Sequence, residues 1–328
     1  MIELRDIERT GLFVGLSELR RAEALAAFKS FEVGPGEELL VEGENDRGML
    51  VVVDGELIVS LGGVELARIG RGETAGEMTL FGSFDRRSAT VSTANSSRLL
   101  LLDEEGMKFL RLQDNPLARE LETRALRTIA RRLRDMDVRI AEKARGEPVE
   151  PRKQRGLFSR LATALGVSGD LPSKAPPQAL EVLKSTPGFM GRDEEILKAL
   201  TAKLELVAVP VGEPIVEEGA RAEDAFIVAE GKVAVYCSVG EARVERVATL
   251  GPGHVFGHVA LADTQGRTAT CRALEPVYLL RIPGVVYRKY ELEQTPEARA
   301  FRRGMIDALS IQLRLANEHI LNMAGRRR

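Results

Sequence analysis

The chain has 328 residues and a mass of 35.9 kDa, which is enough for two domains of ordinary size, each with its own core. Its 47 basic and 49 acidic residues leave a formal net charge of −2, so no general positive field attracts nucleic acid or an anionic membrane. The three histidines and two cysteines lack the spacing of a standard zinc site, and no run of eighteen apolar residues predicts a membrane span. We therefore expect no metal, no nucleic-acid partner and no membrane partner, and a reducing, cytoplasmic compartment.

The first predicted elements are a short helix and a series of short strands. The helix is "SELRRAEALAAF" at residues 17–28. After it, strands with alternating or fully apolar patterns are separated by Gly or Asp-Gly turns, which is typical of a small antiparallel sandwich or barrel. A longer charged helix is predicted to begin near Asn115.

The same series then occurs a second time. "GEELLVEG" at 36–43 aligns with "GEPIVEEG" at 212–219, and Gly76 aligns with Gly257 after five extra residues in the second copy. A second helix, "DEEILKALTAKL", precedes this copy, and a second long helix begins near Pro296. We therefore predict a mainly β fold with flanking helices: two tandem antiparallel β-sandwich domains of the jelly-roll (cupin-like) type, each closed by a long C-terminal α-helix.

Composition places the expected domain boundaries. Residues 146–180 are rich in Pro, Gly and charge, as a linker is expected to be. The predicted domains are therefore 1–145 and 181–328, on either side of the linker 146–180.

The two long helices carry apolar residues at alternating spacings of three and four, which is the pattern of a helix-pairing seam. An apolar stripe that packs on the helix's own sandwich has a similar pattern, so both interpretations stay open. We favour pairing, and with it a homodimer through the long helices. The seam residues are Leu126, Ile129, Leu133, Met136 and Ile140 in the first copy, and Ile306, Leu309, Leu313, Ala316, Ile320 and Met323 in the second.

A stretch at residues 72–91 combines a Gly-Glu pair, a short apolar segment and two adjacent arginines. Gly76 allows the backbone to approach a ligand closely, and the following "MTLF" is typical of one helical turn whose free N–H groups attract an anion. Arg87 opens the next strand and brings a guanidinium, the best side chain for a phosphate, to the same place. A carboxylate beside a phosphate needs a task of its own, and Glu77 can accept a hydrogen bond from a ribose hydroxyl while it fixes the arginine. These residues predict a site for a sugar and one phosphate.

The segment "GEMTLFGSFDRRSATV", after "VDGELIVS" and "LARIGRGE", resembles the phosphate-binding cassette of cyclic-nucleotide-binding domains, as in bacterial catabolite activator proteins and protein kinase A regulatory subunits. The resemblance covers both sandwiches and their helices. It implies that Glu77 binds the ribose 2′-hydroxyl, that Arg87 and Ser88 bind the cyclic phosphate, and that the backbone at Gly76 and Met78 supports them. The first cassette is defined as residues 76–88, and the second, aligned with it, as residues 257–268.

Two details bear on the ligand. Arg132 lies where activator-type proteins direct a helical side chain toward the ligand, although an exposed salt bridge accounts for it equally well. The stretch "RSAT" resembles activators that bind cyclic AMP, so we expect cyclic AMP in preference to cyclic GMP. No other cofactor is expected.

The second cassette departs from this pattern. Arg267 and Thr268 keep the arginine and the hydroxyl, but His258 follows Gly257 where the first cassette has Glu77. Loss of a charged acceptor costs roughly 1.5–3 kcal/mol, or about ten- to a hundredfold in affinity. We therefore expect weak binding or none at Gly257, His258, Arg267 and Thr268. A neutral imidazole still accepts one hydrogen bond, so an altered specificity stays open.

The resemblance also implies a function. Activators of this family carry a helix-turn-helix after the long helix, and kinase regulators carry a pseudosubstrate arm; neither pattern is found in this chain, nor is a catalytic acid–base set. We therefore expect a non-enzymatic cyclic-nucleotide receptor that acts in signal transduction on a separate effector protein. The alternatives are a transcriptional regulator with an unusual basic surface, for which the arginines of residues 124–139 are the main support, and a scaffold that binds no nucleotide.

Overall fold

The computed structural model describes residues 10–143, 171–172, 175–239 and 243–325. The chain divides into two compact units, one made of residues 1–129 and 310–328 and the other of residues 130–309. The expected linker, 146–180, lies mostly outside the described residues. The expected domain limits at 145 and 181 therefore stay a prediction.

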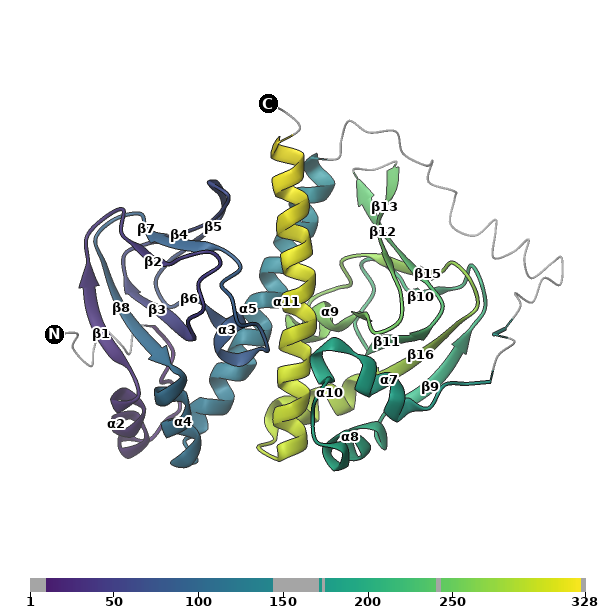
Figure 1. Ribbon diagram of the computed structural model, residues 1–328, viewed down its shortest axis with the longest axis horizontal. Helices are drawn as coiled ribbons and strands as arrows, with labels where there is room; N and C mark the ends of the chain where they lie inside the picture. The colour runs from purple at the N-terminus through teal and green to yellow at the C-terminus, as the bar shows by residue number, and fades with distance from the viewer. Residues whose placement is uncertain (1–9, 144–170, 173–174, 240–242, 326–328) are drawn as a thin grey trace. The chain divides into compact units, whose positions relative to one another are not determined.

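The first unit contains a β-sandwich of two antiparallel four-stranded sheets, with strand orders β1-β8-β3-β6 and β2-β7-β4-β5 (Figure 1). The central strand β3 is buried along almost its whole length, which its apolar sequence GMLVVVD predicts. Its core residues Leu50 and Val52 belong to one cluster with Leu99 of the neighbouring strand β8 and Leu57 of β4 in the other sheet. The strands are β1 Lys29–Val33, β2 Glu38–Leu40, β3 Gly48–Asp54, β4 Leu57–Leu61, β5 Val64–Ile69, β6 Thr74–Ala75, β7 Thr90–Thr93 and β8 Ser97–Asp103.

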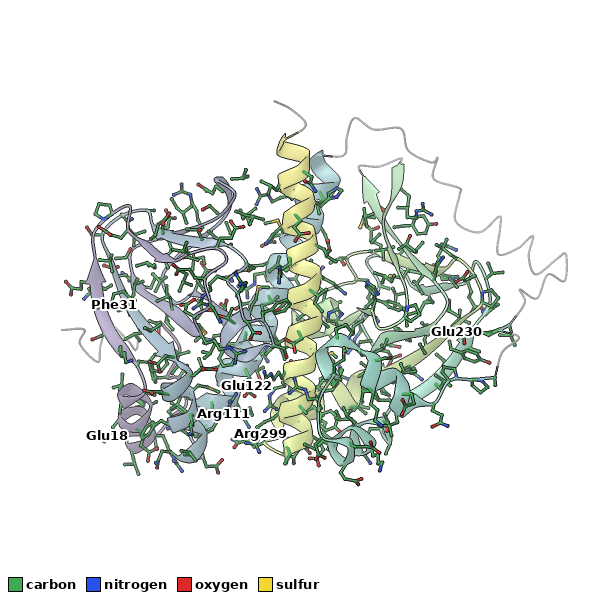
Figure 2. The ribbon with its side chains drawn as sticks, viewed as in Figure 1. Glu18, Phe31, Arg111, Glu122, Glu230 and Arg299 are labelled. Atoms are coloured by element: carbon green, nitrogen blue, oxygen red, sulfur yellow. The ribbon has the colours of Figure 1, made fainter. Side chains whose placement is uncertain are left out.

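Helices precede and follow the strands of this sandwich in the sequence, and one short helix, α3, lies between β6 and β7. They are α2 Glu18–Ala26, α3 Glu77–Phe81, α4 Glu104–Leu112 and the long α5 Pro116–Lys143. Ser17 caps α2, and Asp103 caps α4 by accepting a hydrogen bond from the Gly106 N–H. The helices α4 and α5 are joined by an ion pair of 2.8 Å between Arg111 Nη2 and Glu122 Oε1, both labelled in Figure 2. The start of α5 is therefore tied to α4.

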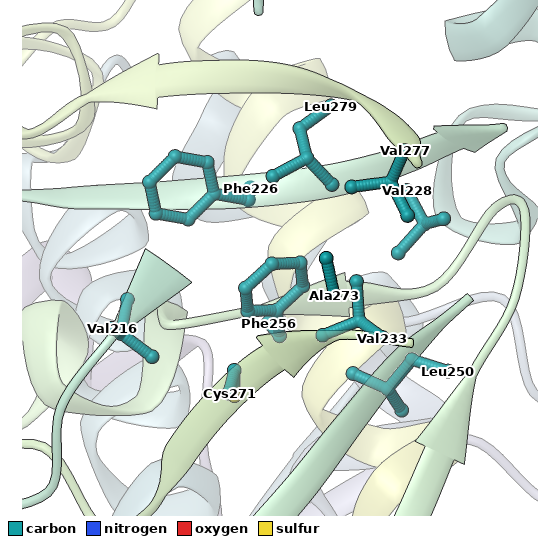
Figure 3. Packing of buried hydrophobic residues seen from close by; sticks show 10 residues of the cluster. All are labelled: Val216, Phe226, Val228, Val233, Leu250, Phe256, Cys271, Ala273, Val277 and Leu279. Carbon is teal, nitrogen blue, oxygen red and sulfur yellow. The ribbon is translucent and has the colours of Figure 1, made fainter. Parts of the chain in front are cut away.

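The second unit repeats the sandwich, with strand orders β14-β11-β16-β9 and β10-β15-β12-β13. Its core lies between the sheets, where the Phe226 and Phe256 rings stack at 5.3 Å between centroids (Figure 3). The five extra residues of the second copy fall in the β12–β13 hairpin, whose strands have seven and eight residues where β4 and β5 have five and six. The strands are β9 Glu205–Val209, β10 Pro214–Val216, β11 Asp224–Glu230, β12 Val233–Val239, β13 Arg243–Leu250, β14 Val255–Phe256, β15 Thr270–Ala273 and β16 Val277–Pro283.

The remaining helices precede or follow the strands of the second sandwich in the sequence, except the short α9, which lies between β14 and β15. They are α7 Ala179–Ser185, the 3₁₀ turn η1 Pro187–Phe189, α8 Glu194–Thr201, α9 His258–Ala262, α10 Gly284–Leu292 and α11 Pro296–Gly325. The predicted fold class is confirmed: two antiparallel jelly-roll sandwiches with flanking helices. "Mainly β" understates the helices, since the two longest elements are α5 with 28 residues and α11 with 30.

The long helices are shared between the units. Residues 116–129 of α5 belong to the first unit and 130–143 to the second, whereas α11 contributes residues 296–309 to the second and 310–325 to the first. A helix of about 30 residues is about 45 Å long, which exceeds the width of one small sandwich. Nine of the predicted seam residues are buried within this single chain: Leu126, Ile129, Leu133, Met136, Ile306, Leu309, Leu313, Ala316 and Ile320. Ile140 is half-buried, and the side chain of Met323 lies outside the described part.

Candidate functional site

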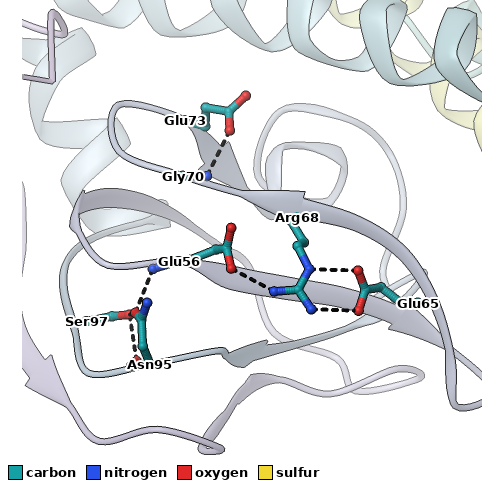
Figure 4. Close-up of polar contacts among 7 residues, drawn as sticks. All are labelled: Glu56, Glu65, Arg68, Gly70, Glu73, Asn95 and Ser97. Carbon is teal, nitrogen blue, oxygen red and sulfur yellow. Dashed lines mark hydrogen bonds and ion pairs between the residues drawn. The ribbon is translucent and has the colours of Figure 1, made fainter.

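The first cassette begins with a turn that only glycine fits. Strand β6 pairs with β3 and ends at Gly76, whose φ is 94°. A Cβ atom at this position would lie 2.4 Å from the carbonyl oxygen of Gly48, which is main chain and cannot move aside. Just before β6, the Glu73 carboxylate accepts the Gly70 N–H at 2.8 Å and stabilises the preceding turn (Figure 4). The chain therefore enters α3 in a defined conformation.

Glu77, the first residue of α3, lies inside the unit. Only 1% of its surface is exposed, and it accepts a short hydrogen bond from the Thr74 hydroxyl. A carboxylate has about four acceptor positions on its two oxygens. The structure thus places a hydrogen-bond-accepting carboxylate inside the unit, at the start of α3.

Arg87 reaches the same place from the segment before β7 and is 5% exposed. Its Nη1 donates to the Thr79 hydroxyl of α3 at 2.6 Å and to the Gly76 carbonyl at 3.3 Å. Its Nε and Nη2 donate to the two carboxylate oxygens of Asp46 at 2.5 and 2.7 Å, which is a bidentate pair. The structure thus brings Gly76, Glu77 and Arg87 together, as the sequence predicts.

The fixing of the arginine differs from the expectation. The sequence predicts Glu77 for that task, but the bidentate partner of Arg87 is Asp46, in the loop between β2 and β3. Sequence reasoning missed Asp46, Thr74 and Thr79. Thr79 lies two residues after Glu77 in the same helical turn and could have been included, whereas nothing local in "EGENDRG" indicates that Asp46 contacts an arginine 41 residues away.

The other predicted residues of the first site have different positions. Ser88 follows Arg87, is half-buried, and its hydroxyl donates to the Met78 sulfur at 3.5 Å. Arg132 lies in α5, in the part that belongs to the second unit. Its predicted contact with a ligand of the first cassette stays a prediction.

The second cassette keeps the turn and changes the charges. Gly257 has a φ of 76°, and His258 after it is fully buried, with neither ring nitrogen hydrogen-bonded in the described chain. Burial, and then the charge of Arg267, lower the pKa of His258 to about 3, so the imidazole is neutral. Arg267 donates to two main-chain carbonyls, Gly257 at 2.5 Å and Asp224 at 2.7 Å. Burial lowers the pKa of Arg267, and Thr268 beside it is half-buried.

Among the residues that the structure describes, no group of three or more His, Cys, Asp or Glu side chains is placed to hold a metal ion. In the same residues no helix has both the length and the apolar character that a membrane crossing requires. Cys237 and Cys271 are buried free thiols, and burial raises the pKa of Cys271 to about 12.

The fold and the first cassette define a class of protein: a tandem jelly-roll with a buried glutamate and a buried arginine at a glycine turn. A family model described as "Cyclic nucleotide-binding domain" matches residues 30–114 and 206–290, together about half of the chain. The chain therefore belongs to the cyclic nucleotide-binding domain family and carries two copies in tandem. Both matches lie within the two sandwiches and extend to α4 and α10.

Individual relatives cover parts of the chain. The cyclic AMP receptor protein of Thermus thermophilus is 30% identical over 100 residues, which is 30% of this chain and 46% of that protein. The cAMP-dependent protein kinase regulatory subunit of Yarrowia lipolytica is 28% identical over 177 residues, 51% of this chain and 46% of that protein. This chain thus spans less than half the length of these curated relatives. A solved structure of the regulatory domain of Toxoplasma gondii PKA with cAMP matches with a TM-score of 0.33 and 18% identity, over 87% of this chain and 90% of that one.

Proposed function

We propose that this chain is a non-enzymatic, cytoplasmic receptor that binds a cyclic nucleotide, cyclic AMP in preference to cyclic GMP, at the first cassette. In this proposal Glu77 accepts the ribose 2′-hydroxyl, Arg87 and Ser88 bind the cyclic phosphate, and the backbone at Gly76 and Met78 supports them. The observation that carries it is the burial of Glu77 and Arg87 together at the Gly76 turn. A carboxylate can accept hydrogen bonds from ribose hydroxyls and a guanidinium is the best side-chain donor to a phosphate, and a cyclic nucleotide presents both groups.

Binding of a phosphate changes the contacts of Arg87. The guanidinium has five N–H donors, and the contacts with Asp46, Thr79 and Gly76 use four of them. One N–H group remains, so a phosphate that binds Arg87 through two N–H groups has to replace an existing acceptor. Asp46 is the acceptor that can leave, because its side chain is 49% exposed and water can solvate the released carboxylate.

Release of Asp46 reaches α4 and α5 through the next residue, Arg47. Arg47 donates to Glu104, the first residue of α4, at 2.9 Å, and α4 is tied to α5 by Arg111 and Glu122. A change at Arg87 thus has a continuous chain of contacts to the long helix within the first unit. This supports the proposal that the nucleotide rearranges α4 and α5, which an effector protein then recognises. A ligand shifts such an equilibrium only by its differential affinity for the two arrangements.

The second cassette is proposed to bind nucleotide weakly or not at all through Gly257, His258, Arg267 and Thr268. A neutral His258 offers at most one acceptor where Glu77 offers a charged pair of oxygens. Two N–H groups of Arg267 already donate to the main-chain carbonyls of Gly257 and Asp224. We propose that the second domain mainly responds to the state of the first.

A homodimer through the long helices also stays a proposal. The seam residues are already buried within the chain, so a second copy would have to use other side chains of these helices. Val138 on α5 and Leu315 on α11, which are 53% and 54% exposed, are apolar side chains of this kind.

The proposed function is tested by isothermal titration calorimetry of the ligand-free protein with cyclic AMP and cyclic GMP, repeated on two matched variants. We expect one high-affinity cyclic AMP per chain, and weaker binding of cyclic GMP. Arg87→Ala should lower the affinity by about a hundredfold, because a charge-assisted contact to phosphate is lost. The equivalent change in the second cassette, Arg267→Ala, should leave it unchanged.

Three other outcomes would change the assignment. Two sites per chain, one lost with each arginine, would make the second domain a nucleotide sensor as well. Tighter binding of cyclic GMP would reverse the base preference. No heat with either nucleotide, together with no rise in melting temperature, would refute the receptor and leave a scaffold.

A further inference from the structure

A buried ion pair holds the second half of α5 against the second cassette, within the second unit. Arg134 donates from Nε and Nη2 to the two carboxylate oxygens of Asp263, at 2.5 and 2.8 Å, and from Nη1 to the Gly266 carbonyl at 2.9 Å. The side chains of Arg134 and Asp263 are only 16% and 4% exposed. A bidentate, shielded pair of this kind is much stronger than an exposed surface pair.

A cassette that binds nucleotide is not expected to have a carboxylate at the position of Asp263. Counted from the first residue of the cassette helix, its equivalent in the first cassette is Gly82. A negative charge in this turn repels a phosphate and attracts a guanidinium. Together with neutral His258 and the carbonyl-bound Arg267, the turn is complementary to the cationic side chain that α5 supplies.

A second residue of α5 faces the same region. Asp137, one turn after Arg134, lies close enough to Cys271 of β15 to contribute to the raised pKa of that thiol, after the larger effect of burial. Arg134 and Asp137 are three residues apart and therefore share a helix face. This face of α5 is turned toward the second cassette.

The equivalent arginine of α11 makes a different contact in the first unit. Arg314 follows Arg134 by 180 residues, the same interval that separates Pro116 and Pro296 at the starts of the two helices. The Arg314 guanidinium carbon lies 5.1 Å from the ring centroid of Phe84, in the turn after α3. A cation–π contact is weaker and less directional than a buried bidentate pair. The two cassettes therefore receive equivalent arginines, but only the second holds its arginine with a carboxylate.

We propose that the second cassette is the binding site, called the seat, of the second half of α5, and that the ion pair of Arg134 and Asp263 holds the helix there. Through this pair the second unit responds to nucleotide bound in the first. The seat itself is independent of the proposed function, whereas the response rests on it. One helix carries both parts, because α5 begins beside α4 in the first unit and ends on the second cassette.

The test uses hydrogen exchange of the full chain, followed by mass spectrometry, with and without cyclic AMP. Asp263→Asn removes the charge but keeps the oxygen that accepts the Gln265 N–H at 3.1 Å, so the turn is preserved. Arg134→Gln removes the other partner, and Arg131→Gln changes an exposed arginine of the same helix as a control. Cyclic AMP binding is measured by calorimetry on the same samples.

Without nucleotide, we expect faster exchange over residues 130–139 in Asp263→Asn and in Arg134→Gln, no further increase in the double variant, and no change in Arg131→Gln. Unchanged exchange in both single variants would overturn the seat. With cyclic AMP, the wild type and Arg131→Gln should show altered exchange over residues 258–268, and Asp263→Asn should lose this response while still binding cyclic AMP.

The two proposals fail in distinguishable ways. If cyclic AMP binds and the response of residues 258–268 persists in Asp263→Asn, the coupling through this pair is refuted. If no variant binds cyclic AMP but exchange over 130–139 still rises, the proposed function fails and the seat stands.

Discussion

Glu77 and His258 occupy equivalent positions in the two cassettes, but one is a carboxylate and the other an imidazole. Glu77 is buried with a hydroxyl donor, Thr74, and lies in a unit where Arg87 carries a carboxylate partner. His258 is buried without a hydrogen-bond partner among the described residues, and its pKa is lowered to about 3. The folded chain keeps this buried imidazole neutral, whereas the unfolded chain can protonate it. The free energy of unfolding therefore depends on pH.

Below pH 6.5 the unfolded chain protonates His258 and the folded chain does not, so the stability due to this residue is lost as pH falls toward 3. Between pH 7 and pH 5 this loss amounts to about 2 kcal/mol. We expect His258→Gln to remove it, so that the free energy of unfolding of the wild type minus that of the variant, measured with urea at pH 7, 6 and 5, falls by about 2 kcal/mol from pH 7 to pH 5. His254→Gln, at an exposed histidine, is the control.

Asp137 contributes to the pH dependence of the free energy of unfolding with the opposite sign, so its effect has to be distinguished from that of His258. Burial raises the pKa of Asp137 to about 7, against a smaller opposing effect of Arg134, so its contribution to stability is lost as pH rises from about 4 to about 7. Because wild type and His258→Gln share Asp137, its contribution cancels in their difference. Equal pH slopes in wild type and His258→Gln would contradict the neutral, buried imidazole.

At the scale of elements, α4 is the connection between the first cassette and α5. Lys29 of β1 and the main chain of Gly106 hold the Asp103 carboxylate at the start of α4, and these contacts lower the pKa of Asp103. Arg47 reaches Glu104 from the loop that also carries Asp46. At its other end, α4 is paired with α5 through Arg111 and Glu122. A displacement of α4 therefore acts directly on α5.

Glu122→Gln should uncouple these two helices without weakening the nucleotide site. The pair of Arg111 and Glu122 contributes about 0.5–1 kcal/mol, because the Arg111 side chain is 43% exposed and solvent screens it. We expect a small loss of stability, unchanged affinity for cyclic AMP by calorimetry, and a reduced effect of cyclic AMP on hydrogen exchange along residues 122–139. Glu105→Gln, at an exposed position of α4, serves as the control. If cyclic AMP changed hydrogen exchange along residues 122–139 as much in Glu122→Gln as in the wild type, the pair of Arg111 and Glu122 would not couple α4 to α5.

At the scale of the whole molecule, the two long helices are the elements common to both units. Each contributes half of its length to the unit of the other copy. Residues 130–143 of α5 therefore belong to a different unit from the sandwich that precedes them in the sequence. The segment that follows α5 in the sequence contains Arg152, Lys153 and Arg155, which are cleavage sites for trypsin.

We expect saturating cyclic AMP to slow tryptic cleavage at residues 152–155 by about fivefold or more, which is the lower range of typical coupling between sites. The physical reason is that the nucleotide favours one arrangement of α5 over the other. The rate is followed by mass spectrometry of the products under limited digestion. In Arg87→Gln, which lacks the phosphate contact, cyclic AMP should leave the rate unchanged. Equal wild-type rates with and without nucleotide would refute the coupling.

The sequence by itself determined the duplication, the antiparallel sandwiches, the glycine turn and the placement of Glu77, Arg87 and His258. These features follow from patterns that are local or that recur at a constant interval, and a turn glycine or an apolar strand keeps its meaning wherever it lies. Tertiary structure alone decided that Asp46 pairs with Arg87 and that Arg134 pairs with Asp263. The partners lie 41 and 129 residues apart, and no local pattern specifies which distant charge a guanidinium meets. The division of α5 and α11 between the units was decided in the same way, because an apolar seam specifies that a helix is buried but not against which partner.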